Sequence, residues 1–150
     1  MKEIINNTRN RLAQVAALKH IDEDWGQLDD YSPNFPVKWP VALIEVRNAT
    51  YTNVGRERGF NPTNRQMATA TIVVHIASLK LTNTSHLAPQ GQKDDAQAIW
   101  PIIEECHSLL HGYKPADYAG AYLRQQIQRR RRDDGVTHYE LVYSLGLTNV

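Results

Sequence analysis

Residues 66–79 have the sequence QMATATIVVHIASL, and this stretch decides the fold class. It is rich in β-branched residues, and Ile72, Val74 and Ile76 fall at every second position. This alternation places the three side chains on one face of a strand, where they can be buried against another layer. We therefore predict a strand over residues 66–79.

Three further strands are predicted around it. One lies before it in residues 39–48, WPVALIEVRN, with Pro40 at its start, where a missing N–H does least harm. The other two form a hairpin from residues 120–131 and residues 138–147, HYELVYSLGL, with Asp134-Gly135 as its tight turn. The last strand alternates clearly, with these side chains on one face: Tyr139, Leu141, Tyr143, Leu145 and Leu147.

Two amphipathic helices are predicted, over residues 2–18 and residues 93–111. Their apolar stripes are Ile5, Leu12, Val15 and Leu18 in the first, and Ala96, Ile99, Ile103, Cys106 and Leu110 in the second. Pro101 departs from the second pattern, because a proline inside a helix removes a hydrogen bond; the helix either bends there or starts later. Residues 20–38 and 81–92 lack periodicity and are predicted to be irregular connectors.

The predicted order is α-β-β-α-β-β. It indicates an α+β fold with an antiparallel four-stranded sheet and two helices packed on one face. A chain of 150 residues suits one domain, residues 1–150. The charges nearly balance, with 17 Lys and Arg against 16 Asp and Glu, so no overall field attracts nucleic acid or anionic lipid. No apolar run reaches membrane-spanning length, and we expect a soluble, cytoplasmic protein without a membrane partner.

No pattern of catalytic or cofactor-binding residues is present, and we expect neither enzymatic activity nor a cofactor. His107 and His111 have the i, i+4 spacing that can hold a metal ion, yet the base of an H-E-x-x-H motif is missing. Two exposed histidines near a helix end are the preferred interpretation, and a metal-dependent enzyme at this pair remains an alternative. Cys106, the single cysteine, lies on the apolar stripe and is predicted to be a core residue.

An arginine cluster is the most unusual local feature. Arg124 and the run Arg129, Arg130, Arg131 and Arg132 place five of the 17 basic residues within nine positions. Such clusters neutralise phosphates, but guanidinium groups bind carboxylates across a protein interface equally well. Because Asp133 and Asp134 follow at once, we favour a protein contact; a solvated hairpin tip and a small nucleic-acid-binding module using Arg124–Arg132 stay open.

The whole pattern resembles the tail terminator (tail completion) proteins of tailed bacteriophages, including the gpU-like and Mu-like prophage families. The resemblance rests on the amphipathic N-terminal helix, the Pro-led strand WPVALIEVRN, a long Gly/Arg loop, the strand TATIVVHIASL, a helix closing in IIEECHSLLHG and a final hairpin ending in HYELVYSLGLTNV. It covers nearly the full length. Pro101 is a departure that bears on how the second helix packs.

The resemblance implies a structural virion protein. Family members form a ring, commonly a hexamer, on the end of the tail tube, where the ring stops polymerisation and meets the head-side connector. The implied partners are further copies of the chain, the tail tube protein and the head–tail connector protein, with nucleic acid only passing through the ring. The implied location is the host cytoplasm during assembly and then the virion tail. Another neck or connector subunit is the related alternative.

The loop of residues 49–65 is much longer than an ordinary hairpin loop, and long loops persist mainly where they have a function. A protein contact is the leading interpretation. The candidate subunit or partner interface therefore consists of loop residues and the arginine run: Tyr51, Arg56, Arg58, Phe60, Arg129, Arg130, Arg131 and Arg132.

Overall fold

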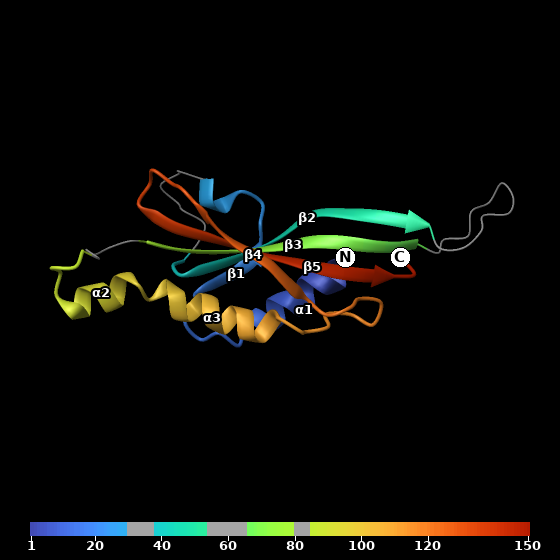
Figure 1. The fold of residues 1–150 in the computed structure, drawn as a ribbon, viewed down its shortest axis with the longest axis horizontal. Helices are drawn as coiled ribbons and strands as arrows, with labels where there is room; N and C mark the ends of the chain where they lie inside the picture. The colour runs from blue at the N-terminus through green and yellow to red at the C-terminus, as the bar shows by residue number, and fades with distance from the viewer. Residues whose placement is uncertain (30–37, 54–65, 80–84) are drawn as a thin grey trace, which may run out of the picture.

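The computed structural model describes residues 1–29, 38–53, 66–79 and 85–150. Its elements in chain order are α1 (Lys2–Leu12), β1 (His20–Glu23), the 3-10 helix η1 (Gln27–Asp29), β2 (Val41–Asn53), β3 (Gln66–Leu79), α2 (Gln90–Ala96), α3 (Ile99–Leu110), β4 (Leu123–Arg130) and β5 (Val136–Thr148). The described strands form one mixed sheet in the order β1-β2-β3-β5-β4 (Figure 1). The predicted α+β class is confirmed.

The prediction of four antiparallel strands is wrong, because β1 adds a fifth strand parallel to β2. His20 aligns with Val41, and Glu23 aligns with Ile44. The segment was predicted to be an irregular connector, since two of its four residues are acidic and disfavour strands. Pairing with the edge of β2 and packing of Ile21 against the core outweigh that weak local preference.

The other strands lie close to their predicted positions. β3 has the predicted bounds, and the two predicted hairpin pairs, β2–β3 and β4–β5, are antiparallel as expected. The two hairpins are joined by an antiparallel β3–β5 pair, which was not predicted. β2 continues past residue 48 to Asn53 after a bulge between Val46 and Asn48, so Tyr51 belongs to this strand. The loop that was predicted over residues 49–65 therefore starts after Asn53 and not at residue 49.

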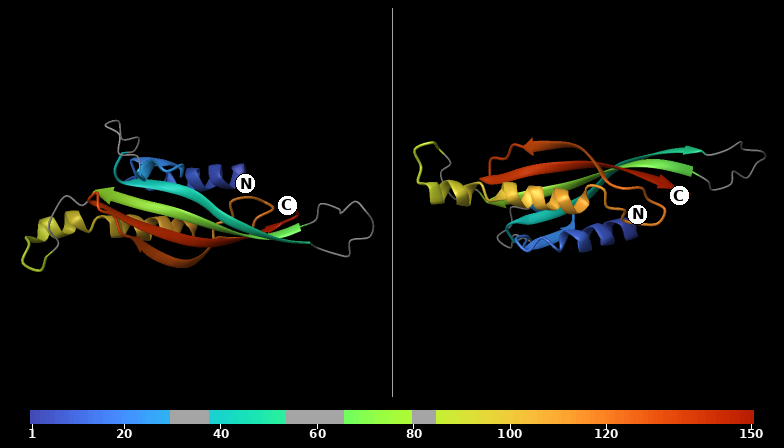
Figure 2. Two further views of the ribbon diagram at one scale, coloured as in Figure 1. Left: turned by 90° about the horizontal axis from the view of Figure 1, so that it is seen from above. Right: turned by 60° about the horizontal axis from the view of Figure 1, so that its bottom comes forward.

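Both main helices cover the same face of the sheet, as predicted (Figures 1 and 2). α1 and α3 share one apolar cluster with the side chains of β2, β3 and β5. Helix α1 ends at Leu12 instead of residue 18, yet Val15 and Leu18 are still buried in the turns that follow. The largest fully buried apolar and aromatic side chains here are Ile4, Leu12, Ile44, Ile72, Ile76, Leu110, Tyr122, Leu141, Tyr143 and Leu145.

The predicted second helix is divided into α2 and α3. Pro101 has no N–H to donate to the carbonyl of Gln97, four residues earlier, and its ring would clash with that carbonyl. The break falls between Ala96 and Ile99, and Pro101 then occupies the first turn of α3, where N–H groups have no helical partner. Of the two outcomes expected for this proline, the later start is confirmed. Helix α2 projects beyond the end of the sheet (Figure 1).

The opposite face of the sheet, which we call the open face, has a smaller apolar cluster. Leu28 of η1 packs there on Val41 and Leu43 of β2, on Ala77 of β3 and on Val136 of β5. Polar side chains occupy much of the remaining described area of this face. The two ends of the open face carry different kinds of side chain, and they are described in the next section.

Candidate interface surfaces and a buried polar cluster

Strand β4 is an exposed edge of the sheet. It pairs only with β5 among the described strands, and all eight of its residues are exposed. Two of them are large apolar residues: Leu123 is 51% exposed and Ile127 is 41% exposed. An unpaired edge with exposed apolar side chains is a template for contact with another chain.

The side chains of the arginine run, residues 129–132, do not form one continuous surface patch. Arg129 lies opposite Tyr139 and Arg130 opposite His138 in the β4–β5 register, so the two side chains leave opposite faces of the sheet. Arg130 Nε lies 3.0 Å from Glu140 Oε1. Arg131, beyond the end of β4, is exposed.

Arg132 is half-buried and makes structural contacts. Its guanidinium lies 2.7 Å from Asp134 Oδ2 and 3.1 Å from Asp29 Oδ1, and it donates to the carbonyl oxygen of Leu28. The hydrogen bond from Arg132 lowers the pKa of Asp134, against the raising effect of burial. These contacts join the turn between β4 and β5 to η1.

An aromatic pair lies beside Arg129 and was not anticipated. The rings of Trp100 on α3 and Tyr139 on β5 are 4.8 Å apart, and Trp100 is 42% exposed. Trp, Tyr and Arg are the residues that most often dominate binding energy at protein interfaces. The signal in the sequence is that Trp100 falls off the apolar stripe of its helix, so it faces outward.

Tyr51 lies far from the arginines. It is 49% exposed and aligns with Ala68 of β3, whereas Arg129 lies in register with Tyr139 and hence with Ile76 of β3. The separation is eight residues, or about 27 Å along a strand. The structure therefore places the predicted contact residues at opposite ends of the sheet. The predicted contacts of Arg56, Arg58 and Phe60 lie outside the described residues.

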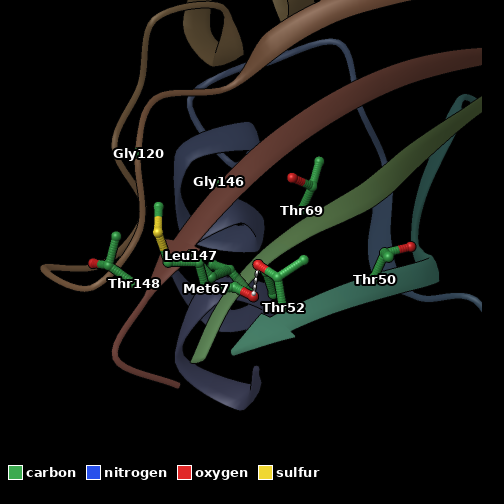
Figure 3. A pocket seen from close by; sticks show the side chains of 9 residues that line it. Thr50, Thr52, Met67, Thr69, Gly120, Gly146, Leu147 and Thr148 are labelled. Carbon is green, nitrogen blue, oxygen red and sulfur yellow. Dashed lines mark hydrogen bonds between the residues drawn. The ribbon is translucent and has the colours of Figure 1, made fainter. Parts of the chain in front are cut away.

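The open face near Tyr51 holds a shallow depression of about 470 Å³ (Figure 3). Its lining is Thr50, Thr52, Met67, Ala68, Thr69, Gly120, Gly146, Leu147 and Thr148. None of the described side chains that line it is ionisable, so they supply neither a general acid nor a general base. A floor of threonine methyl and hydroxyl groups around Gly146 suits contact with another polypeptide surface better than catalysis.

Tyr122, the aromatic residue next to the Arg124–Arg132 segment, is buried. Tyr122 is 1% exposed, and its hydroxyl lies 2.7 Å from Thr8 Oγ1. Burial raises its pKa to about 12. It cannot stack on a base, which weakens the nucleic-acid interpretation of Arg124–Arg132.

The His107 and His111 rings lie 5.0 Å apart but have other neighbours. His107 Nδ1 is 3.3 Å from the Tyr143 hydroxyl, and His111 Nδ1 accepts a hydrogen bond from the Arg124 N–H at 3.2 Å. Among the described residues, no third metal-ligating side chain joins this pair. Cys106 is fully buried, which confirms the core prediction, and burial raises its pKa to about 12.

A group of ionisable side chains lies on the open face next to η1, and the sequence analysis did not identify it. We call it the open-face cluster; its members are Asp24, Glu45, Arg47, His75, Arg130, His138 and Glu140. His75, His138 and Glu140 are buried. The signal was present in the sequence, since polar residues fall on one face of β2, β3 and β5.

His75 is at the centre of the open-face cluster. Its Nδ1 lies 2.9 Å from His138 Nε2, and its Nε2 lies 2.9 Å from Glu45 Oε2 and 3.6 Å from Asp24 Oδ2. Burial is the main cause that lowers the pKa of His138 to about 4, followed by the charge of His75, so His138 is neutral at pH 7.

Arginines neutralise two carboxylates of the cluster. Arg47 lies 2.9 Å from Glu45 and 3.2 Å from Glu140, and Arg130 reaches Glu140 from β4. One buried atom of the cluster, His138 Nδ1, nevertheless lacks a hydrogen-bond partner among the described residues, whereas Glu140 Oε1 is paired with Arg47 and Arg130. The cluster is therefore only partly satisfied by the chain itself.

Among the described residues, no helix is long and apolar enough to span a membrane. A family model described as "Phage tail terminator protein" matches residues 4–149. No curated protein matches the chain. A solved structure titled "Virion of native gene transfer agent (GTA) particle" is similar with a TM-score of 0.60 and 8% sequence identity, over 96% of this chain and 91% of the other. That likeness concerns the fold.

Proposed function

The chain belongs to the phage tail terminator family of structural tail proteins, and from this premise we propose that it forms a ring that caps the tail tube. In this proposal the ring ends tube polymerisation and joins the tail to the head connector. The partners are further copies of the chain, six in the proposed ring, together with the tail tube protein and the connector protein. Nucleic acid only passes through the ring.

The observation that carries the proposal is the family match over residues 4–149, and the distribution of exposed surfaces supports it. A closed ring needs heterologous contacts, in which one patch of each copy meets a different patch of the next. Arg129 of the edge strand β4 lies with Trp100 and Tyr139 at one end of the sheet, and the threonine depression of the open face lies at the other end, where Tyr51 projects from the opposite, helix-covered face. Two unlike patches at opposite ends fit a head-to-tail arrangement.

The test measures assembly and tube length. Size-exclusion chromatography with light scattering gives the mass of the free protein, and electron microscopy shows whether rings cap tubes of the cognate tail tube protein. We expect a ring, free or on the tube, and tubes that stop growing when the protein is added. A monomer at every concentration that leaves tube growth unchanged contradicts the proposal. Capping without an arrest of growth favours another neck subunit.

A matched pair of tryptophan variants tests the ring contact. Trp100→Ala removes the exposed aromatic beside Tyr139, whereas Trp25→Ala removes one that is 61% exposed near β1. Loss of an interface hot spot costs about 2 kcal/mol or more, which weakens assembly at least about 30-fold. We expect this loss in Trp100→Ala alone. Equal assembly of the two variants contradicts the assignment of this surface.

A further inference from the structure

The threonine depression of the open face surrounds a position without a side chain (Figure 3). Two rows of residues cross β2, β3 and β5 in register here, and both rows face the open side: Thr50–Thr69–Gly146 and Thr52–Met67–Thr148. Gly146 alone of these six has no side chain. The depression is therefore open above the backbone of β5.

Nothing in the described part of the chain requires a glycine at position 146. Its φ lies outside the positive range, and the β3–β5 register continues through it without a bulge. A Cβ at this position would have no described atom within 4 Å. A glycine inside a strand weakens the strand and often marks a place where a ligand or another backbone comes close. Gly146 thus indicates that a group from outside the chain approaches β5 here.

The lining of the depression favours an uncharged group. Its described side chains are threonines, methionine, leucine and alanine. A charged group placed on this surface would lose water without gaining an opposite charge, which is costly. A large aromatic ring loses little hydration and buries about 150–250 Å². The chemistry of the lining therefore selects an aromatic side chain, for which threonine hydroxyls also offer hydrogen-bond acceptors.

Trp100 is an exposed aromatic side chain with the required surroundings. It is 42% exposed, and its ring packs on Tyr139 at 4.8 Å, so little side-chain freedom is lost when it binds. Trp25 is 61% exposed, but it directly follows the acidic residues 22–24. Docking of Trp25 would bring those carboxylates against an uncharged surface. Trp100 is therefore the better occupant.

The charges beside the two surfaces are complementary. Arg129 is exposed and lies in register with Tyr139, next to Trp100. Asp117 is exposed and adjoins Tyr118, whose carbonyl oxygen accepts a hydrogen bond from the N–H of Thr148 in the lining. Neither Arg129 nor Asp117 has an ion-pair partner among the described residues. Opposite charges placed in this way steer two surfaces together and fix their orientation.

We propose that Trp100 of one copy inserts into the threonine depression of the next copy, above Gly146, with Arg129 of the first copy beside Asp117 of the second. This contact rests on the proposed ring and names the residues that close it. The indole packs on threonine methyl groups and on the thioether of Met67. A stable interface buries about 1,200–2,000 Å² in total, so the tryptophan anchors a wider contact to which the exposed edge strand β4 contributes.

A glycine variant tests the depression without disturbing the fold. Gly146→Phe fills the hollow from within, and because a Cβ has open space there, the urea midpoint is expected to stay at or above that of the wild type. Ring formation, measured by light scattering and by electron microscopy of capped tubes, is expected to weaken at least about 30-fold. Gly91→Phe adds the same side chain at an exposed position of α2, and assembly is expected to stay within about twofold.

The outcomes separate this contact from the ring itself. Rings that form equally well with Gly146→Phe overturn the contact and leave the ring proposal standing. Absence of rings and of tube capping in the wild type contradicts the ring proposal, and the contact falls with it. Equal loss in Gly146→Phe and Gly91→Phe also contradicts the assignment, because the effect then does not depend on the depression.

Exchange of the two charges tests which surfaces meet. Arg129→Glu and Asp117→Arg, made separately, each place like charges together and are expected to weaken assembly at least about threefold. The chain with both changes restores the opposite pair and is expected to recover assembly to within about twofold of the wild type. Arg131→Glu makes the same change at another exposed arginine and is expected to have no effect. Failure of the doubly changed chain to recover overturns the pairing of these surfaces.

Discussion

The face of the sheet beneath α1 and α3 is filled by aliphatic and aromatic side chains, whereas the open face has buried ionisable side chains beside η1 and threonines at its other end. Strand β5 shows the contrast within adjacent residues. Leu141 points to the helices and Glu140 to the open face, and both are buried. One face is stabilised mainly by removing apolar surface from water, and the other depends on paired charges.

The largest effect is expected on the helix-covered face. Leu141→Ala removes a fully buried side chain between two layers and leaves a cavity, so the free energy of unfolding should fall by about 2–5 kcal/mol in urea titrations. Val142→Ala is the matched change on the open face, where the side chain belongs to neither apolar cluster. It should cost less. A larger loss for Val142→Ala contradicts the difference between the faces.

A smaller but substantial effect is expected in the open-face cluster. Glu140→Gln keeps the shape of a buried side chain and removes the charge that Arg47 and Arg130 contact. The free energy of unfolding, measured in urea titrations, should fall by about 1–3 kcal/mol. Glu45→Gln, where the carboxylate is 29% exposed, should cost less because water replaces part of the interaction. If both changes are neutral, the paired charges on this face do not stabilise the fold.

A third test concerns the contact that joins the open face to η1. Arg132→Met keeps much of the buried stem and removes the hydrogen bonds to Asp29, Asp134 and the Leu28 carbonyl, so a loss of about 1–2 kcal/mol is expected at pH 7. Arg131→Met, at an exposed neighbour, should change the free energy of unfolding by less than about 0.5 kcal/mol.

The effect of Arg132→Met should also depend on pH. Arg132 lowers the pKa of Asp134 below its ordinary value of 3.8, so well above that pH the folded and unfolded states both have this carboxylate ionised and the contribution is fully present. As the pH falls through the folded-state value, the unfolded chain has already taken up a proton and the contribution is lost. The difference between wild type and Arg132→Met should therefore shrink below pH 4. A constant difference would show that Asp134 is not the group concerned.

The same comparison explains how much of the fold could be predicted. On the helix-covered face, burial repeats at every second residue of β3 and β5, and the strands are found from that period alone. Strand β1 has four residues, two of them acidic, and it forms because β2 offers an open edge. The end of α1 was also missed, since Val15 and Leu18 are buried in turns that continue the helical spacing.

The candidate surfaces divide in the same way. Strand alternation accounts for the separation of Arg129 from Arg130, and the helical stripe accounts for the core position of Cys106. The open-face cluster depends on contacts between residues far apart in the chain, such as His75 with His138. Those contacts depend on the register of strands, which the sequence pattern does not specify. The pairing of Arg132 with Asp29 crosses a similar distance.

The smallest effect is expected at Pro101, where the single helix predicted from the sequence is divided into α2 and α3 in the structure. Described α2 residues are exposed or half-buried, so the layer over the sheet consists of α1 and α3. Pro101→Ala restores the N–H that could donate to Gln97 and allows α2 to continue into α3. Helix content in circular dichroism should rise, while the free energy of unfolding should change by less than about 1 kcal/mol, because proline also restricts the unfolded chain. A loss of several kcal/mol would mean that the break itself positions α3 on the sheet, so that the helix-covered face depends on more than buried apolar area.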